Sequence, residues 1–379
     1  MLKLARCAGR VSVLKGFVFI CIVAAGTKTL AQQWPLFRGD PAGSGAVKEE
    51  LPSDLDLLWE KRFDETEFQS GAAIYDGVIY IGDADGAVRA LNLADGELIW
   101  EKKFDTFFIT TPSVRDDTIY FGDTDGVLRA LEAKTGKSKW EYTTGAEQET
   151  GPNFYKDRLL VTSYDGSLTA LEADTGKEIW KHTIDEPIQC GPTLAGSLTF
   201  LGGCDESLHV IDVESGEPVQ EPLPLFSPTG STPSVSNGIV FVPTSSGEIV
   251  AYNPKEREPL WRFYDSRLAS EFKRVSVAVA EGLVVATSRN KRVFALDAKT
   301  GKVRWQAPLR KRSDASPLIA GQSVFVVAAD GRVLRFDLKT GKELWMMELK
   351  PTFTASPAAA DGKLVVASKR GVVYCFGKR

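Results

Sequence analysis

Short apolar runs recur along the chain at regular intervals, and each run is closed by a turn. Residues 119–122 (IYFG), 159–162 (LLVT) and 324–327 (VFVV) are continuous apolar runs of strand length, so they predict buried strands. The first run leads through a turn at 123–126 (DTDG) into a second apolar strand at 127–132 (VLRALE). These units lack the apolar spacing of 3.6 residues that marks a helix, so the pattern predicts an all-β chain.

A hairpin and a tryptophan end each unit. The phrase ALEAKTGKSKW at 130–140 returns as ALEADTGKEIW at 170–180 and as ALDAKTGKVRW at 295–305. Its glycine supplies the left-handed backbone conformation of a tight hairpin. The tryptophan four residues later falls on the next strand, where its flat ring can pack against the neighbouring unit. We interpret seven tryptophans as structural docking residues of this kind: Trp59, Trp100, Trp140, Trp180, Trp261, Trp305 and Trp345.

The tryptophans return about every 40 residues, and such a period indicates stacked supersecondary units. With the short Pro-led segment in front, each unit has four strands, as in a β-propeller blade. The last unit, 355–376, lacks the strand that carries the tryptophan. The strand at 55–63 carries Trp59 but is not preceded by three strands of its own. The sequence therefore predicts an eight-bladed β-propeller over residues 55–379. We expect the N-terminal strand to join the C-terminal blade and close the ring, which removes an exposed sheet edge.

A small residue followed by proline opens most units at the same place. Proline suits a strand edge that has no partner, and we expect the innermost strand, beside the central channel, to be such an edge. The pairs are at 111–112, 151–152, 191–192, 232–233, 316–317 and 356–357.

The first 31 residues have the composition of a cleaved signal peptide. A basic start precedes the apolar run GFVFICIVAAG at 16–26, and TLA at 29–31 places small residues before the expected cut. The run is shorter than the roughly 20 apolar residues of a spanning helix, and Cys21 follows VFI, which is unlike a lipidation site. We expect an exported chain, periplasmic or extracellular, without a lipid anchor or a transmembrane segment. Residues 32–54 form an N-terminal lead before the propeller.

Charge and composition narrow the function classes. The net charge of the 379-residue chain is −4; cleavage would remove five of the 46 Lys and Arg residues and leave −9, so nucleic acid is not an expected partner. The chain has only two histidines, His182 and His209, which argues against a multi-histidine metal site and against a histidine-dependent relay. We expect no metal site.

The repeated phrase ALxAxTGKxxW resembles the tryptophan-docking repeat of PQQ-type β-propellers, over roughly residues 55–379. That superfamily includes quinoprotein alcohol dehydrogenases and the BamB-like outer-membrane assembly factors. The lead WPLFRGDPAGSG at 34–45 also resembles the start of many exported PQQ-repeat proteins. The resemblance implies the propeller fold, and it implies function less directly because sites are grafted onto folds.

Catalytic signatures are missing from the sequence. The vicinal cysteines and long insertions of quinoprotein dehydrogenases have no counterpart here, and no nucleophile-elbow motif occurs. We therefore expect no catalytic residues and no cofactor. The leading hypothesis is a non-catalytic, monomeric scaffold that binds an envelope or secreted protein, as BamB-like proteins do. The alternatives are a PQQ-binding or quinone-linked redox protein and, more weakly, a binder of glycans or small ligands at the channel mouth.

Blade topology gathers the loops between blades and the loops joining the second and third strands on one face, here called the loop face. In the first four blades these loops are acidic, and in the last three they are basic. Charge runs are usually solvated surface, but converging loops of one sign also steer a complementary partner. We predict that a partner or ligand binds the basic sector: Lys273, Arg274, Arg289, Lys291, Arg292, Arg310, Lys311 and Arg312.

Two further features stay open. Cys190 and Cys204 fall on neighbouring strands of the fourth unit, where they either form a disulfide or remain free thiols. The fourth unit has Gln220 in the tryptophan slot, and the fifth has Arg257 in the glycine slot. These broken repeats mark either a specialised surface or tolerated drift.

Overall fold

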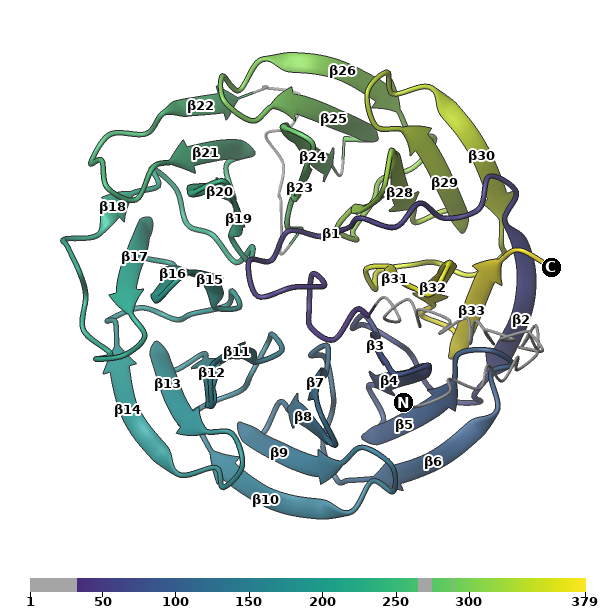
Figure 1. Ribbon diagram of the computed structural model, residues 1–379, viewed down its shortest axis with the longest axis horizontal. Helices are drawn as coiled ribbons and strands as arrows, with labels where there is room; N and C mark the ends of the chain where they lie inside the picture. The colour runs from purple at the N-terminus through teal and green to yellow at the C-terminus, as the bar shows by residue number, and fades with distance from the viewer. Residues whose placement is uncertain (1–32, 265–274, 289) are drawn as a thin grey trace, which may run out of the picture. The chain divides into compact units, whose positions relative to one another are not determined.

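Eight β-sheets, antiparallel except for one added strand, follow one another around a central axis in the computed structural model (Figure 1). The structure describes residues 33–264, 275–288 and 290–379, all within one compact unit that spans 31–379. The predicted signal peptide, 1–31, lies outside the described residues. No helix within the described part of the chain has the length and apolarity to cross a membrane.

Each of the first four blades contains four strands in chain order from the axis outward. Blade one consists of β3 (Ala73–Tyr75), β4 (Val78–Gly82), β5 (Ala87–Asn92) and β6 (Leu98–Lys103). Blade two consists of β7 (Ser113–Arg115), β8 (Thr118–Gly122), β9 (Val127–Glu132) and β10 (Ser138–Thr143). Blade three consists of β11 (Asn153–Tyr155), β12 (Arg158–Ser163), β13 (Ser167–Glu172) and β14 (Glu178–Thr183). Blade four consists of β15 (Thr193–Ala195), β16 (Leu198–Gly202), β17 (Ser207–Asp212) and the short β18 (Leu223–Pro224).

The remaining blades repeat this plan with two additions from the N-terminal region. Blade five consists of β19 (Ser234–Ser236), β20 (Ile239–Pro243), β21 (Glu248–Tyr252) and β22 (Trp261–Tyr264). Blade six consists of β23 (Ala278–Ala280), β24 (Leu283–Ser288), β25 (Arg292–Asp297) and β26 (Val303–Pro308). Blade seven consists of β27 (Leu318–Ala320), β28 (Ser323–Val327), β29 (Arg332–Asp337) and β30 (Glu343–Glu348), with β1 (Ala46–Val47) added in parallel to β27. Blade eight consists of β31 (Ala358–Ala360), β32 (Lys363–Ala367), β33 (Val372–Gly377) and β2 (Asp56–Arg62).

The ring closes as the sequence predicts. Strand β2 pairs antiparallel with β33, from Asp56 opposite Gly377 to Arg62 opposite Val372. The N-terminal strand is thereby the outermost strand of the C-terminal blade (Figure 1). Closure joins the two ends of the propeller in one sheet, so neither end exposes an unpaired edge.

The tryptophans dock each blade onto the next one. The Trp180 indole Nε1 donates a hydrogen bond to the Val213 carbonyl of blade four, 3.0 Å away, and its ring lies against Gly216. A Cβ built on Gly216 would lie 2.6 Å from the ring, so the glycine is required for this close approach as well as for its φ of +80°. Trp59, Trp100, Trp140, Trp261 and Trp305 repeat both contacts with the following blade.

Trp345 and the junction between blades four and five depart from this rule. In blade eight no hairpin joins the third strand, β33, to the fourth, β2, so the docking glycine is missing. Trp345 instead meets Phe376 edge to face, with ring centroids 5.8 Å apart. Each tryptophan docks onto the glycine of the following blade. Gln220 replaces the tryptophan of blade four and Arg257 replaces the glycine of blade five, so the two substitutions remove one and the same docking contact. The junction is filled by buried Leu223 and Tyr252, whose hydroxyl donates to the Pro224 carbonyl at 2.6 Å.

The N-terminal lead runs through the central channel and fills its middle (Figure 1). Its carbonyls accept backbone hydrogen bonds from the inner strands of blades one, two, four, five, six and seven in turn. The donors are Ile74, Val114, Leu194, Val235, Val279 and Ile319. The expectation that the inner edge lacks a partner is therefore wrong. The repeated prolines lie just ahead of the inner strands, one residue before the edge that binds the lead.

A buried arginine anchors the lead to blades six and seven. The Arg38 guanidinium is fully buried and donates to the carbonyls of Val277 and Pro317, at 3.0 and 2.7 Å. Burial lowers the pKa of Arg38 to about 9, and the Asp40 carboxylate opposes that shift. Gly45 passes so close that a Cβ would lie 1.8 Å from the guanidinium. The segment WPLFRGDPAGSG is thus a fitted channel plug, a role its sequence did not reveal.

Candidate functional site at the channel mouth and loop face

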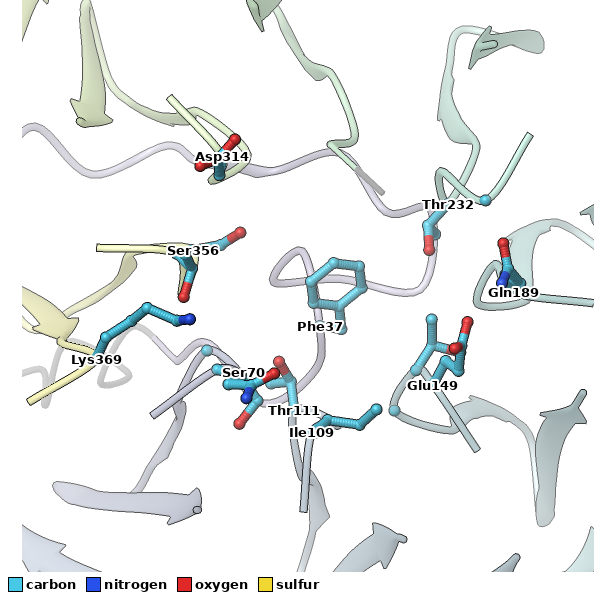
Figure 2. Close-up of a pocket in the computed structure, with 16 residues that line it drawn as sticks. Phe37, Ser70, Ile109, Thr111, Glu149, Gln189, Thr232, Asp314, Ser356 and Lys369 are labelled. Carbon is cyan, nitrogen blue, oxygen red and sulfur yellow. The ribbon is translucent and has the colours of Figure 1, made fainter. Parts of the chain in front are cut away.

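A cavity of about 250 Å³ lies at the mouth of the channel on the loop face (Figure 2). Most of its wall comes from equivalent positions of the blades, two to four residues ahead of each inner strand. Gln69, Ile109, Glu149 and Gln189 are the fourth residue ahead in blades one to four. Side chains at the same position of successive blades therefore form a circle around the axis.

The lead supplies the floor of this cavity. Residues 36–39 form a tight turn in which the Gly39 amide donates to the Leu36 carbonyl at 2.9 Å. Arg38, with a φ of +66°, turns away into its buried site, and Leu36 is buried. Phe37 is the half-buried residue at the turn, and Figure 2 shows its ring at the centre of the lining side chains. An aromatic ring is thus fixed on the axis.

Small hydroxyl residues tie adjacent blades together around the mouth. The amide of Gly191 donates to the Thr232 hydroxyl oxygen at 2.8 Å. Ser276 and Ser316 repeat the contact: each amide donates to the hydroxyl oxygen of the next blade, Ser316 at 2.9 Å and Ser356 at 3.1 Å. Because backbone amides hold these oxygens in place, the wall is a rigid frame with its hydroxyl hydrogens available as donors.

The loop face is built as expected, since the loops between blades bond to the loops joining the second and third strands. The amide of Thr124 donates to the Phe107 carbonyl at 3.2 Å, and the amide of Ala329 donates to the Arg312 carbonyl at 2.9 Å. Two loop sets of different origin therefore form one continuous surface.

Five residues of the predicted basic sector are described. Lys291, Arg310, Lys311 and Arg312 are exposed on the loop face, and Arg292 is half-buried. Lys273, Arg274 and Arg289 lie outside the described residues.

Ion pairs engage part of this sector. Arg310 contacts Asp330 and Glu348, at 3.2 and 3.0 Å, and these partners raise its pKa. Arg312 Nε lies 2.8 Å from an oxygen of Asp314, which lines the cavity. Arg312 therefore lies beside the lining of the cavity.

The acidic sector carries less surface charge than the sequence suggests. Asp83 and Asp123 are fully buried, where they cap their own turns and pair with Arg89 and Arg129. These two carboxylates are structural, because a buried charge requires a partner. The acidic residues that are exposed on this sector are Asp64, Glu65, Asp85, Asp105, Asp125, Asp165, Asp185, Glu186 and Glu206.

The cysteines of blade four do not form a disulfide. Cys190 is fully buried, and its sulfur lies 3.1 Å from the Gly202 carbonyl oxygen and 3.2 Å from the Gly202 amide. Thr110 makes the equivalent contact with the Gly122 carbonyl in blade two. Cys190 therefore replaces a hydroxyl of the repeat and faces Gly202, whereas Cys204 is a half-buried free thiol beyond it.

A second, more open cavity of about 520 Å³ lies between blades three and four. Both histidines line it, together with Asp205 and Gln220. His209 Nε2 lies 2.6 Å from Asp205. Burial lowers the pKa of His182, and nearby His209 lowers it further. Within residues 33–264, 275–288 and 290–379, no group of three or more His, Cys, Asp or Glu side chains is placed to hold a metal ion.

A family comparison decides the affiliation of the chain. The sequence model of the family described as "Outer membrane protein assembly factor BamB" matches residues 52–153, 146–262, 257–346 and 330–379. The chain belongs to this BamB family. A comparison with curated proteins finds no match.

Solved structures agree on the fold of this BamB-family chain. BamB from Moraxella catarrhalis is 19% identical, with a TM-score of 0.73 over 86% of this chain and 98% of that one. The computationally designed Ika8 protein is 17% identical, with a TM-score of 0.74 over 85% and 99%. Quinohemoprotein alcohol dehydrogenase from Comamonas testosteroni is 15% identical, with a TM-score of 0.77 over 92% and 81%. At these identities the likeness shows the propeller and no shared activity.

The described wall of the channel mouth is poorly suited to PQQ, the cofactor that a quinone-linked redox function would require. PQQ carries three carboxylates, which require several cationic or amide donors. The wall of this BamB-family chain offers one lysine, Lys369, whose Nζ lies 3.8 Å from Glu67, and two carboxamides, Gln69 and Gln189. It also presents the carboxylates of Glu149 and Asp314, the second of which pairs with Arg312. Like charges facing a polyanion oppose its binding.

Sequence reasoning placed the loop face and offered the channel mouth as an alternative ligand site, but it did not identify the residues that line the cavity. Phe37 and Gln189 carried no motif, and the lead was not expected to enter the channel. The available signal was positional: Gln69 and Gln189 both stand four residues ahead of an inner strand. Aligning the repeats on their strands would have gathered the wall, although not its floor.

Proposed function

We propose that this BamB-family chain is an exported, non-catalytic scaffold that binds a protein partner of the cell envelope through its loop face. The observation that carries the proposal is the division of that face into two sectors of opposite charge. The family description names an outer-membrane assembly factor, so the envelope is the compartment in which to seek the partner.

The basic sector is the stronger candidate for the contact. Lys311 and Arg312 are exposed in the loop that enters blade seven, and Lys291 is exposed in the neighbouring blade. Lys369 and Arg370 extend the exposed sector into blade eight. Converging cations of this kind raise the rate of encounter with an acidic surface and fix its orientation.

A quinone-linked redox function is the second candidate, because quinohemoprotein alcohol dehydrogenase shares the fold. The poor fit of the described channel wall to a tricarboxylate weighs against it. Titrating the purified protein with PQQ and Ca²⁺ separates the two functions: a saturable change in PQQ absorbance would favour the redox alternative.

The partner hypothesis is tested with two matched charge reversals. Lys291→Glu with Lys311→Glu alters the loop face, whereas Lys302→Glu with Lys342→Glu alters exposed lysines in the hairpins of the opposite face. Both variants change the net charge equally. Each is used as bait in envelope extract from its own cells, and captured proteins are quantified by mass spectrometry.

We expect a protein enriched by the wild type to be lost from the loop-face variant and kept by the hairpin-face variant. Melting temperatures of all three proteins confirm that the ring is intact. Equal capture by both variants would contradict the proposal, and loss from both would show only a dependence on net charge.

A further inference from the structure

We propose that the channel mouth is a binding site for a single neutral sugar ring, a pyranose, with Phe37 as its floor. The proposal concerns a small ligand on the axis, and it does not depend on protein binding by the loop face. It rests on the cavity, on the way its floor is built, and on the polar groups in its wall.

The floor is rigid and aromatic. Phe37 sits in the turn 36–39, which is held on one side by Arg38 in its buried site and on the other by Trp34, whose amide and carbonyl both pair with Ile74 at 2.8 Å. The backbone of Phe37 therefore cannot move away from the axis without breaking these contacts, and its ring lies at the centre of the lining side chains (Figure 2). The faces of pyranoses carry apolar C–H groups that pack on aromatic rings, so a fixed ring at the base of a polar cavity suits them.

The wall supplies amide and hydroxyl groups. The Gln189 carboxamide lines the cavity, and no side chain of the described residues bonds to it. Thr354 lines the cavity too, and its buried Oγ1 has no partner among the described residues. The Thr232 hydroxyl accepts the Gly191 amide and keeps its own hydrogen to donate. Unsatisfied donors and acceptors in one wall match hydroxyl groups, which are both.

The charges of the wall select a neutral ligand. Glu149 and Asp314 bring carboxylates to the cavity, and Lys369 lies on the opposite side of Phe37 from Glu149 (Figure 2). Charged groups at the mouth already contact groups of opposite charge: Arg312 Nε lies 2.8 Å from Asp314, and Lys369 Nζ lies 3.8 Å from Glu67. A charged ligand would have to compete with these pairs, whereas a neutral ligand leaves them in place. Carboxylates accept hydrogen bonds from neutral hydroxyls without this competition. The volume of about 250 Å³ is at the small end of ligand sites, which limits the buried part to one ring.

The test uses purified residues 32–379 and four probes: methyl β-D-glucopyranoside, methyl β-D-galactopyranoside, N-acetyl-D-glucosamine and the acyclic polyol D-sorbitol. Saturation-transfer NMR and calorimetry measure binding. We expect at least one ring probe to bind with a Kd of about 1 mM, as its size allows, and sorbitol to bind at least about tenfold more weakly.

Variants assign the binding to the mouth. Phe37→Ala and Phe37→Leu should each weaken it about tenfold, the second while keeping apolar volume in the turn. Gln189→Ala should weaken it as well, whereas the control Gln322→Ala, exposed on the opposite face, should not. The melting temperature of Phe37→Leu shows whether the plug is intact.

Absence of binding by every ring probe at tens of millimolar would overturn the proposal, as would undiminished binding by folded Phe37→Leu or equal binding of sorbitol. The loop-face variant Lys291→Glu with Lys311→Glu should bind the sugar normally. Loss of partner capture with intact sugar binding, or the reverse, therefore separates this proposal from the proposed function.

Discussion

Trp59 lies directly opposite Cys375, although 316 residues of chain separate the two positions. Cys375 occupies the position that alanine holds opposite Trp100 and Trp140, and it is fully buried. The indole Nε1 of Trp59 donates across to the Leu93 carbonyl of blade one at 3.1 Å. One tryptophan thus joins the C-terminal blade to the first blade, and the ring depends on it at the point where the chain's two ends meet.

Replacing this tryptophan is expected to weaken the whole ring. Trp59→Ala removes the indole hydrogen bond and the packing on Gly96, so we expect the free energy of unfolding to fall by about 3 kcal/mol. Urea unfolding followed by circular dichroism measures the loss. Leu98→Ala, at a side chain 42% exposed on the outer strand of blade one, is the control and should change stability by less than about 0.5 kcal/mol. A Trp59→Ala variant as stable as the control would show that closure does not rely on docking.

The hairpin glycines separate backbone strain from close packing. Gly216 has a φ of +80° and lies under Trp180, whereas Gly238 has a φ of +75° with open space where a Cβ would be. Gly238→Ala should therefore cost about 1 kcal/mol from strain alone. Gly216→Ala should cost about 2–4 kcal/mol, because its Cβ also displaces the indole. Equal losses in the two variants would mean that the tryptophan moves aside freely.

Most of the architecture could be predicted from the repeat of about 40 residues in the sequence. Glycine and tryptophan four residues apart specify a hairpin and a docking ring at once, so blade number, strand order and closure could all be predicted. The lead could not be predicted in the same way. Its partners, such as Val114 and Val279, are spread over six blades, and no local period in WPLFRGDPAGSG encodes contacts with a circle of strands.

For the candidate site, the sequence could predict which loops share a face, but not the contacts that their side chains make. Loop positions follow from topology, so Lys311 and Arg312 could be placed on the loop face, but the burial of Asp83 depends on Arg89 six residues later, turned inward by the strand. The sequence shows the sign of each side chain's charge, but it does not show which side chain of opposite charge will pair with it. The same gap explains Cys190, whose contact with Gly202 copies the hydroxyl contacts of other blades.

Thiol reactivity should follow burial. Burial raises the pKa of Cys190 and of Cys375 to about 12, and it raises the pKa of Cys204 with help from nearby Glu186. In residues 32–379 at pH 8, we expect one slow thiol, Cys204, to react with Ellman's reagent, and all three to react in urea. Cys204→Ser should leave the native protein unreactive. A single reactive thiol in urea would reveal a disulfide and contradict the structure.

The stability of the ring should fall in mild acid because of His182. Burial lowers its pKa below the ordinary value of 6.5, nearby His209 lowers it further, and Glu217 opposes them. The folded state therefore takes up the proton less readily than the unfolded state, and the free energy of unfolding falls as the pH drops below about 6.5. His182→Gln removes this contribution, so the variant should lose less of its melting temperature than the wild type between about pH 7.5 and pH 5.5. NMR of the two imidazoles, assigned with the same variant, measures the His182 pKa directly. Identical pH profiles for the two proteins, or a His182 pKa at or above 6.5, would show that the cavity between blades three and four leaves this imidazole as hydrated as in the unfolded chain.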